Sequence, residues 1–126
     1  MARFISVIRK DVSNSSGSPT AIITGSTNSS GIPASTYGVV LSILASNKNA
    51  NSQNVTVQLI KAGGTGSEVV GSLITSGVIP NQSSLEFMTG NKLIVEPGDW
   101  IKAYATAASA IDITVSYMLN PQDTSI

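Results

Sequence analysis

The chain contains neither cysteine nor histidine, and these two absences exclude most of the usual catalytic and metal-binding chemistry. Without cysteine there is no disulfide, no zinc–thiolate site and no thiol nucleophile. Without histidine the commonest general base is missing, so neither a Ser–His nor a Cys–His pair can form. The lack of cysteine also favours folding in a reducing cytoplasm, because secreted domains of this size often carry a disulfide.

Charged side chains are scarce as well. Only 11 % of the 126 residues are charged, and seven basic residues balance seven acidic ones, whereas an ordinary soluble domain has roughly 25 %. A chain with zero net charge has no long-range field that would attract nucleic acid or an anionic membrane surface, so neither is an expected partner. It also has little electrostatic protection against association, which favours an oligomer or an assembly subunit.

Long apolar runs are missing too. No stretch approaches the ~20 apolar residues of a membrane-spanning helix. The first ten residues break their apolar run at Ser6 and end in charge at Arg9 and Lys10, which is unlike a signal peptide. A hydrophobic content of 41 % in 126 residues is enough for one core and leaves no room for a second.

The sequence does contain a repeated alternation of apolar and polar side chains, which is the pattern of half-buried strands. In residues 111–119 every odd position is apolar, and in 39–45 the alternation places Val39, Leu41 and Ile43 on one face. Turns rich in Gly, Pro and Asn separate the runs, and the Ala-rich residues 106–110 are too short for a helix and predict a loop. We therefore expect an all-β domain, an antiparallel, jelly-roll-like β-sandwich of about eight short strands. The expected strands include 3–8, 39–45, 55–59, 93–95, 100–104 and 111–119.

Residues 1–36 differ from the sandwich core that we expect over 37–126. After the first strand, residues 11–36 are mostly Ser, Thr, Asn, Gly and Pro, with Ile22 and Ile23 apolar in the middle. Such a segment cannot bury enough surface alone to offset its ordering entropy. Two interpretations stay open: a loosely held loop with a short edge strand, or an arm that orders against a neighbouring subunit.

Four carboxylates could in principle form a catalytic or calcium-binding pair. They are Glu86, Glu96, Asp99 and Asp112. Glu96 and Asp99 flank a Pro–Gly turn, where an aspartate commonly bonds nearby backbone. We expect Asp112 to be solvated or paired with Lys102, on the polar face of the last strand. The dense acidic spacing of a calcium loop is absent, so these residues predict turn and surface roles.

The remaining polar motifs do not indicate catalysis. A Ser–Lys pair is formally possible, but nothing places a serine beside Lys48, Lys61, Lys92 or Lys102. The glycine-rich residues 63–66 lack the following lysine and helix of a phosphate-binding loop, and they predict a hairpin turn. We expect no catalytic residue, no cofactor and no bound metal, and hence no enzyme.

The aromatic residues could form a platform that stacks on sugars or bases. They are Phe4, Tyr37, Phe87, Trp100, Tyr104 and Tyr117. We expect Trp100 and Tyr117 to be core anchors, because aromatics in a sandwich with so few of them usually pack inside. Basic residues are not interleaved with the aromatics, which argues against single-stranded nucleic acid as a ligand.

From Tyr37 to Leu119 the order of strands and turns resembles small structural virion proteins of tailed bacteriophages. The segments that carry the resemblance are LASNKNANSQNVTVQL and VIPNQSSLEFMTGNKLIVEPGDWIKAYATAASAIDITVSYML. In that group a Pro-led turn precedes an SLE strand, followed by G-x-K-L-I-V-E-P-G-D and a closing D-x-T-V-S-Y strand. The resemblance covers about two-thirds of the chain.

The resemblance implies a β-sandwich that assembles as a homo-oligomer, with a trimer favoured, on a virion assembled in the host cytoplasm. The expected role is a capsid cement or decoration protein bound to the major capsid protein, acting through many weak contacts. Residues 11–36 would then be a strap between capsomers, and an exposed strand edge could pair with a neighbour's strand. The alternatives are a neck or tail accessory protein and a module that binds carbohydrate or a host surface.

Overall fold

The structure is a computed structural model that describes residues 3–25, 31–61, 69–88 and 92–121. Over these residues the chain forms nine β-strands and no helix, and accordingly none of the described residues belongs to a helix that could cross a membrane. The strands are β1 (Arg3–Arg9), β2 (Thr20–Ile23), β3 (Thr36–Asn47), β4 (Gln53–Lys61), β5 (Val69–Ile79), β6 (Ser84–Glu86), β7 (Leu93–Val95), β8 (Trp100–Ala105) and β9 (Ile111–Pro121).

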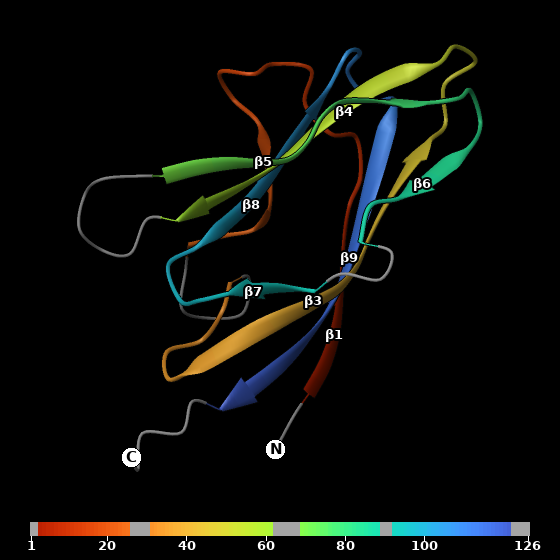
Figure 1. Cartoon of the computed structure of the whole chain (residues 1–126). Coiled ribbons are helices and arrows are strands. Elements are labelled where there is room, and N and C mark those ends of the chain that lie inside the picture. Colours follow the sequence, from red (N-terminus) through yellow and green to blue (C-terminus); the bar gives the residue numbers. More distant parts are fainter. Residues whose placement is uncertain (1–2, 26–30, 62–68, 89–91, 122–126) are drawn as a thin grey trace.

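The strands form two antiparallel sheets that pack face to face (Figure 1). One sheet has the order β1-β9-β3-β6, with β7 also paired to β3, and the other has the order β2-β8-β4-β5. The pairs are nested along the chain: β1 pairs with β9, β2 with β8, β3 with β6 and β7, and β4 with β5. Successive pairs alternate between the sheets, which is the jelly-roll arrangement. The predicted fold class is confirmed.

The core is built around one face of β9. Ile111, Ile113, Val115, Tyr117 and Leu119 are all buried, and their neighbours along the strand are only half-buried. This is the alternation that the sequence predicts for 111–119. Across the sandwich, β8 and β4 supply smaller buried side chains such as Ala103 and Val57. The predicted loop at 106–110 joins β8 directly to β9.

The prediction for the face of β3 is wrong, because a bulge interrupts the alternation. The pairing of β3 with β9 shifts by one residue between Val40 and Ser42, so Leu41 is the extra residue. A bulge moves the following side chains to the opposite face. Val40 and Ile43 are therefore fully buried, while Leu41 points outward and is 37 % exposed.

Strand β5 is absent from the sequence-based prediction for a related reason. Its pairing with β4 shifts register twice, which breaks any regular alternation of apolar residues. Two glycines within the strand, Gly71 and Gly77, weaken the strand signal further. A Cβ at Gly77 would lie 2.3 Å from Cδ1 of Ile74, so any larger residue would make the Ile74 side chain move.

The described part of residues 11–36 packs against the sandwich. The segment is polar, yet Val12, Ile22, Ile23 and Ile32 are fully buried. The amide of Val12 donates to the carbonyl of Ile111 at 2.9 Å, and β2 lies at the edge of its sheet beside β8. The burial comes from contact with the rest of the domain, and removal of residues 1–36 would delete two strands.

Strand β6 is only three residues long, and the carboxylate of Glu86 fixes it to β3. One carboxylate oxygen accepts the amides of Ile43 and Met88, each at 3.0 Å, and the other accepts the hydroxyl of Ser42. Partial burial alone would raise the pKa of Glu86. The hydrogen bonds from Ser42, Met88 and Ile43 outweigh it and hold the pKa below its ordinary value of 4.5.

We expect Ile113→Ala to lower the free energy of unfolding by about 2–5 kcal/mol, because it leaves a cavity in the middle of the core. The matched control is Thr114→Ala, on the outward face of the same strand, with an expected change below about 1 kcal/mol. Urea unfolding followed by circular dichroism measures both. Equal losses for the two variants would contradict the assignment of faces on β9.

We expect Glu86→Gln to lower stability at neutral pH by about 1 kcal/mol, since an exposed charged acceptor is replaced by a neutral one. The folded-state pKa of Glu86 is lowered, so its contribution is present above pH 4.5 and is lost as the pH falls through the folded value. The difference in unfolding free energy between wild type and variant should therefore shrink in acid. The difference in unfolding free energy between wild type and Thr114→Ala should stay constant over the same pH series, because this substitution involves no titrating group.

Candidate functional site

Glu96 and Asp99 lock a turn and are not free for chemistry. The carboxylate of Asp99 is 2 % exposed, accepts the amide of Glu96 at 2.8 Å and lies 2.6 Å from Nζ of Lys61. Glu96 reaches the same ammonium at 2.8 Å. Burial alone lowers the pKa of Lys61, but its hydrogen bonds to Asp99 and Glu96 outweigh this and raise the pKa. Gly98, at φ 92°, supplies the left-handed conformation of the turn.

The predicted pairing of Asp112 with Lys102 is wrong. Asp112 is the second residue of β9, and Lys102 lies on β8 in the opposite sheet. Asp112 instead lies 3.0 Å from Nζ of Lys48 and accepts the amide of Asp11 at 2.9 Å. Burial raises its pKa, whereas these two hydrogen bonds lower it and prevail. Lys48 also binds the carboxylate of Asp11, and the two acids raise its pKa.

The structure brings Glu96 and Asp99 together at Lys61 and places Glu86 and Asp112 elsewhere. Glu86 lies on β6, Glu96 and Asp99 flank the turn between β7 and β8, and Asp112 is the second residue of β9. Among the described residues no three acidic side chains come together as a metal site would require. Each of these carboxylates is bonded to a backbone amide or to a lysine. The glycine-rich residues 63–66 lie outside the described residues.

The aromatic residues divide between the core and the surface. Tyr117 is 2 % exposed and is the predicted core anchor, and burial raises the pKa of its hydroxyl. The prediction for Trp100 is wrong, because the inward face of β8 is taken by Ile101, Ala103 and Ala105. Trp100 and Tyr104 therefore lie on the outer face of that sheet, half-buried. Between them, Nζ of Lys102 stands 4.5 Å from the centre of the Trp100 ring.

The large exposed hydrophobic side chains lie on the edge strands of the sandwich. Phe4, 75 % exposed, and Ile8 are on β1, Val70 and Val78 are on β5, and Ile94 is on β7. Among the large exposed hydrophobic residues that the structure describes, Leu41, in the bulge of β3, is the one that lies away from an edge strand. Monomeric β-proteins usually protect such edges with charge or proline. The sequence signal for β1 is visible in hindsight, since residues 4, 5, 7 and 8 are apolar and make both faces of the strand apolar.

Strand register places four apolar side chains in one line across the outer face of the first sheet. Phe4 is opposite Met118, Met118 is opposite Val39, and Val39 is opposite Ile94. Residues directly opposite one another in antiparallel strands share a face. We call this line, formed by Phe4, Met118, Val39 and Ile94, the apolar row. Beside it runs a row of three serines, Ser6, Ser116 and Ser42.

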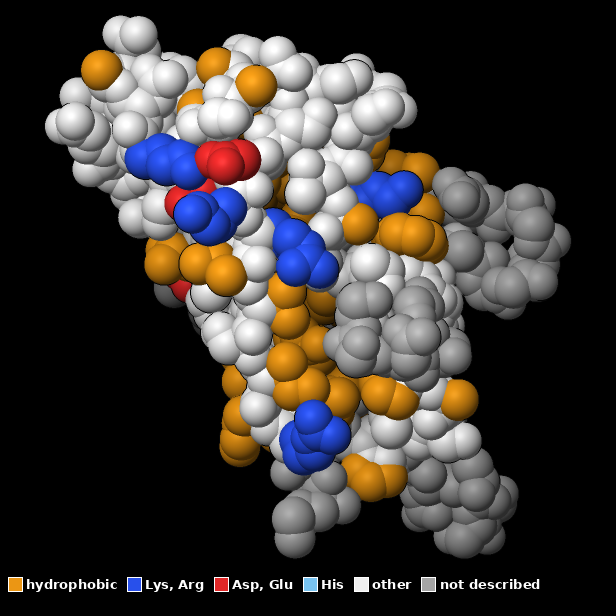
Figure 2. Space-filling view, turned by 180° about the vertical axis from the view of Figure 1, so that it is seen from behind, with side chains coloured by type: hydrophobic (Ala, Val, Ile, Leu, Met, Phe, Trp, Pro, Cys, Tyr) orange, Lys and Arg blue, Asp and Glu red, His pale blue; other side chains and the backbone are white. Residues whose placement is uncertain are grey.

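The space-filling view shows how charge and apolar surface are distributed on the face seen from behind (Figure 2). The acidic side chains visible there lie against basic ones. Other basic side chains stand next to a continuous band of apolar side chains and have no acidic neighbour in this view. This face thus carries a band of apolar surface bordered by basic side chains.

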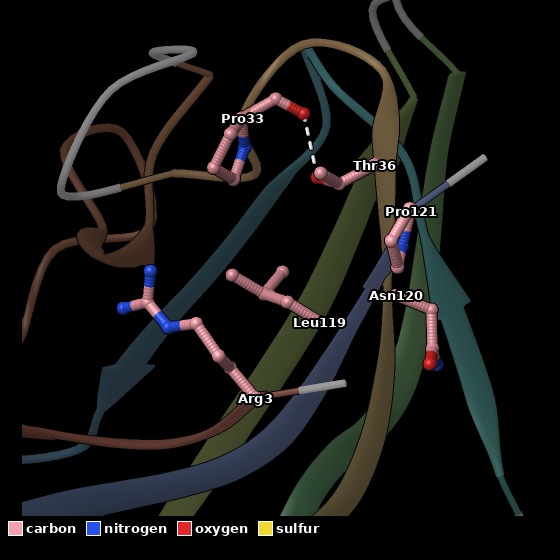
Figure 3. Close-up of a pocket in the computed structure, with 6 residues that line it drawn as sticks. All are labelled: Arg3, Pro33, Thr36, Leu119, Asn120 and Pro121. Atoms are coloured by element: carbon pink, nitrogen blue, oxygen red, sulfur yellow. Dashed lines mark hydrogen bonds between the residues drawn. The ribbon is translucent and has the colours of Figure 1, made fainter. Parts of the chain in front are cut away.

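A cavity of about 210 Å³ lies at the end of the sandwich where β1 begins and β9 ends (Figure 3). Leu119 occupies its middle, and the hydroxyl of Thr36 donates to the carbonyl of Pro33 at 2.6 Å. Arg3 is its one charged side chain. The residues around the cavity are Arg3, Pro33, Thr36, Leu119, Asn120 and Pro121. A lone guanidinium offers no base or nucleophile, so the cavity fits binding of a side chain better than catalysis.

No family model matches the chain, and no curated protein matches it. Solved structures do. One comes from work describing Bacillus endospore appendages as a novel family of disulfide-linked pili: it is 15 % identical, with a TM-score of 0.52 over 98 % of this chain and 88 % of that one. Another is from the T13 particle of the virus IBDV: it is 7 % identical, with a TM-score of 0.51 over 96 % of this chain and 31 % of that one. The chain spans about a third of that second protein. At such identities the likeness establishes a shared fold.

Proposed function

We propose that this chain is a non-enzymatic structural subunit that assembles with copies of itself and with a larger protein shell. The observation that carries the proposal is the placement of exposed apolar side chains on edge strands, among them Phe4 and Ile94 at the two ends of the apolar row. These side chains lie on edge strands of both sheets, in a chain with few charges. Apolar surface of this kind is typical of protein–protein contact.

The shared fold supports the proposal. Two solved structures with this fold come from assemblies, a pilus in one case and a viral particle in the other. This chain has no cysteine, so its contacts are non-covalent, unlike the disulfide links named for those pili. Weak non-covalent contacts become collectively strong when many subunits repeat them.

Within this class we propose a cement or decoration protein of a tailed-bacteriophage virion. The support is the resemblance of residues 37–119 to small virion proteins of that group, together with the jelly-roll topology. A symmetric trimer bound to the major capsid protein is the arrangement that we favour. A neck or tail accessory protein would use the same surfaces and is the nearest alternative.

We expect light scattering on a sizing column to give one discrete oligomer, with a trimer at three times 12.9 kDa. Ile94→Asp, which places a charge in the apolar row, should weaken self-association about ten-fold or more. Lys102→Gln, on the outer face of the other sheet, is the control and should leave the mass unchanged. A monomer at every concentration would contradict self-assembly through this row.

A module that binds carbohydrate is the second candidate, favoured by the outward placement of Trp100 and Tyr104 on β8. Aromatic faces on a sheet surface can stack on sugar rings, and Lys102 and Gln58 lie on the same face. If this function holds, a glycan array should give saturable binding that Tyr104→Ala reduces about ten-fold. Binding that Tyr104→Ala leaves intact, or no binding at all, would dismiss it.

A further inference from the structure

Strand β1 is the one long and regular edge of the described sandwich. It pairs with β9 through seven uninterrupted residue pairs, from Arg3 opposite Leu119 to Arg9 opposite Ile113. No other described strand pairs with its second side. Of the remaining edges, β2, β6 and β7 are three or four residues long, and two register shifts distort β5. A straight open edge is a template for another strand.

The two ends of this edge differ. At the far end, Nε of Arg9 donates to the carbonyl of Ala21 at 3.1 Å, so β1 is attached there to the second sheet. At the near end, Arg3 is exposed and borders the cavity at Leu119. The free length is therefore Arg3 to Val7, and it leads into the cavity. A strand laid beside β1 would place one of its side chains there.

Charge indicates which partner fits. Every acidic residue in the described part of the chain already has an internal partner: Asp11 and Asp112 bind Lys48, Glu96 and Asp99 bind Lys61, and Glu86 binds backbone amides of β3 and Met88. Arg3 has no acidic partner among these residues. In a second copy, each described carboxylate would have to share its present lysine or amide partner with Arg3, whereas a different protein can supply an unshared carboxylate.

We infer that the β1 edge binds an extended segment of a different protein, which adds to the sheet as a strand beside Arg3–Val7. The segment carries an acidic side chain that faces Arg3 and an apolar side chain that enters the cavity at Leu119. Backbone hydrogen bonds provide the affinity of such an added strand, and the pocket provides its specificity. The inference rests on the proposed function in one respect. The proposed function identifies the source of the segment as a protein of the shell to which the subunit attaches.

The probe is a fluorescein-labelled eight-residue peptide of alternating valine and threonine. It ends in Leu-Thr-Glu in one version and begins with Glu-Thr-Leu in the other, so that the leucine and the glutamate share a face and both strand directions are tested. We expect one version to bind saturably by fluorescence anisotropy. N-methylation of alternate amides along one side of that peptide should weaken binding more than ten-fold, since it removes the inter-strand hydrogen bonds. Absence of binding by both versions, or equal binding by the N-methylated peptide, would overturn the inference.

The role of Arg3 is tested with a charge exchange. Arg3→Glu should weaken binding of the glutamate-containing peptide about ten-fold. Replacing the peptide's glutamate by lysine should restore binding to this variant. Lys92→Glu reverses an exposed charge away from β1 and is the matched control. Equal binding by wild type and Arg3→Glu would overturn the assignment of the acidic side chain to Arg3.

This test is separate from that of the proposed function. Arg3 lies outside the apolar row, so Arg3→Glu should leave the oligomer mass unchanged. An oligomer that fails to bind the peptides overturns the inference alone. A monomer that binds them overturns self-assembly and leaves the edge site in place.

Discussion

The buried face of β9 is the constraint on which the rest of the molecule depends. Its five inward side chains fill the middle of the core, and its two edges hold β1 and β3. The polar N-terminal segment is attached to it as well, through the amide of Val12 and the carbonyl of Ile111. Because β9 fixes the register of both neighbours, it also aligns Phe4, Met118 and Val39 on the outside. The core and the proposed contact surface are two sides of one strand.

Sequence alone predicts the parts of the fold that follow a simple period. Strand β9 alternates without interruption, so its limits and its buried face can be predicted from residues 111–119. In residues 39–45 of β3 only Ser42 is polar, so the alternation is weaker there, and the bulge at Leu41 arises from pairing with β9, a contact between distant segments. Strand β5 carries two such shifts and escapes prediction altogether. Local pattern cannot report irregularities that a partner strand imposes.

The residues of the candidate site likewise divide into those whose role follows from the local sequence and those whose role depends on contacts between distant strands. The turn role of Asp99 follows from its place after Pro97 and Gly98, and the structure bears it out through the amide of Glu96. The partner of Asp112 depends on which sheet each strand joins, and the alternation in the sequence carries no information on that. The apolar row is still less accessible to prediction, since it exists only when four strands lie in register. Its members are ordinary apolar residues that are far apart in the sequence.

The nested pairing of strands also determines the order in which the protein can fold. Strand β1 is made before the other described strands, yet its partner β9 is made after all of them. Until then both apolar faces of β1 lack their partners, and the core lacks the side chains of β9. Pairing between such distant segments is slow, and exposed strand edges favour misassembly in the meantime. The sandwich is therefore complete only after β9 has been made, and the outer face that we propose as a contact surface forms at that late stage.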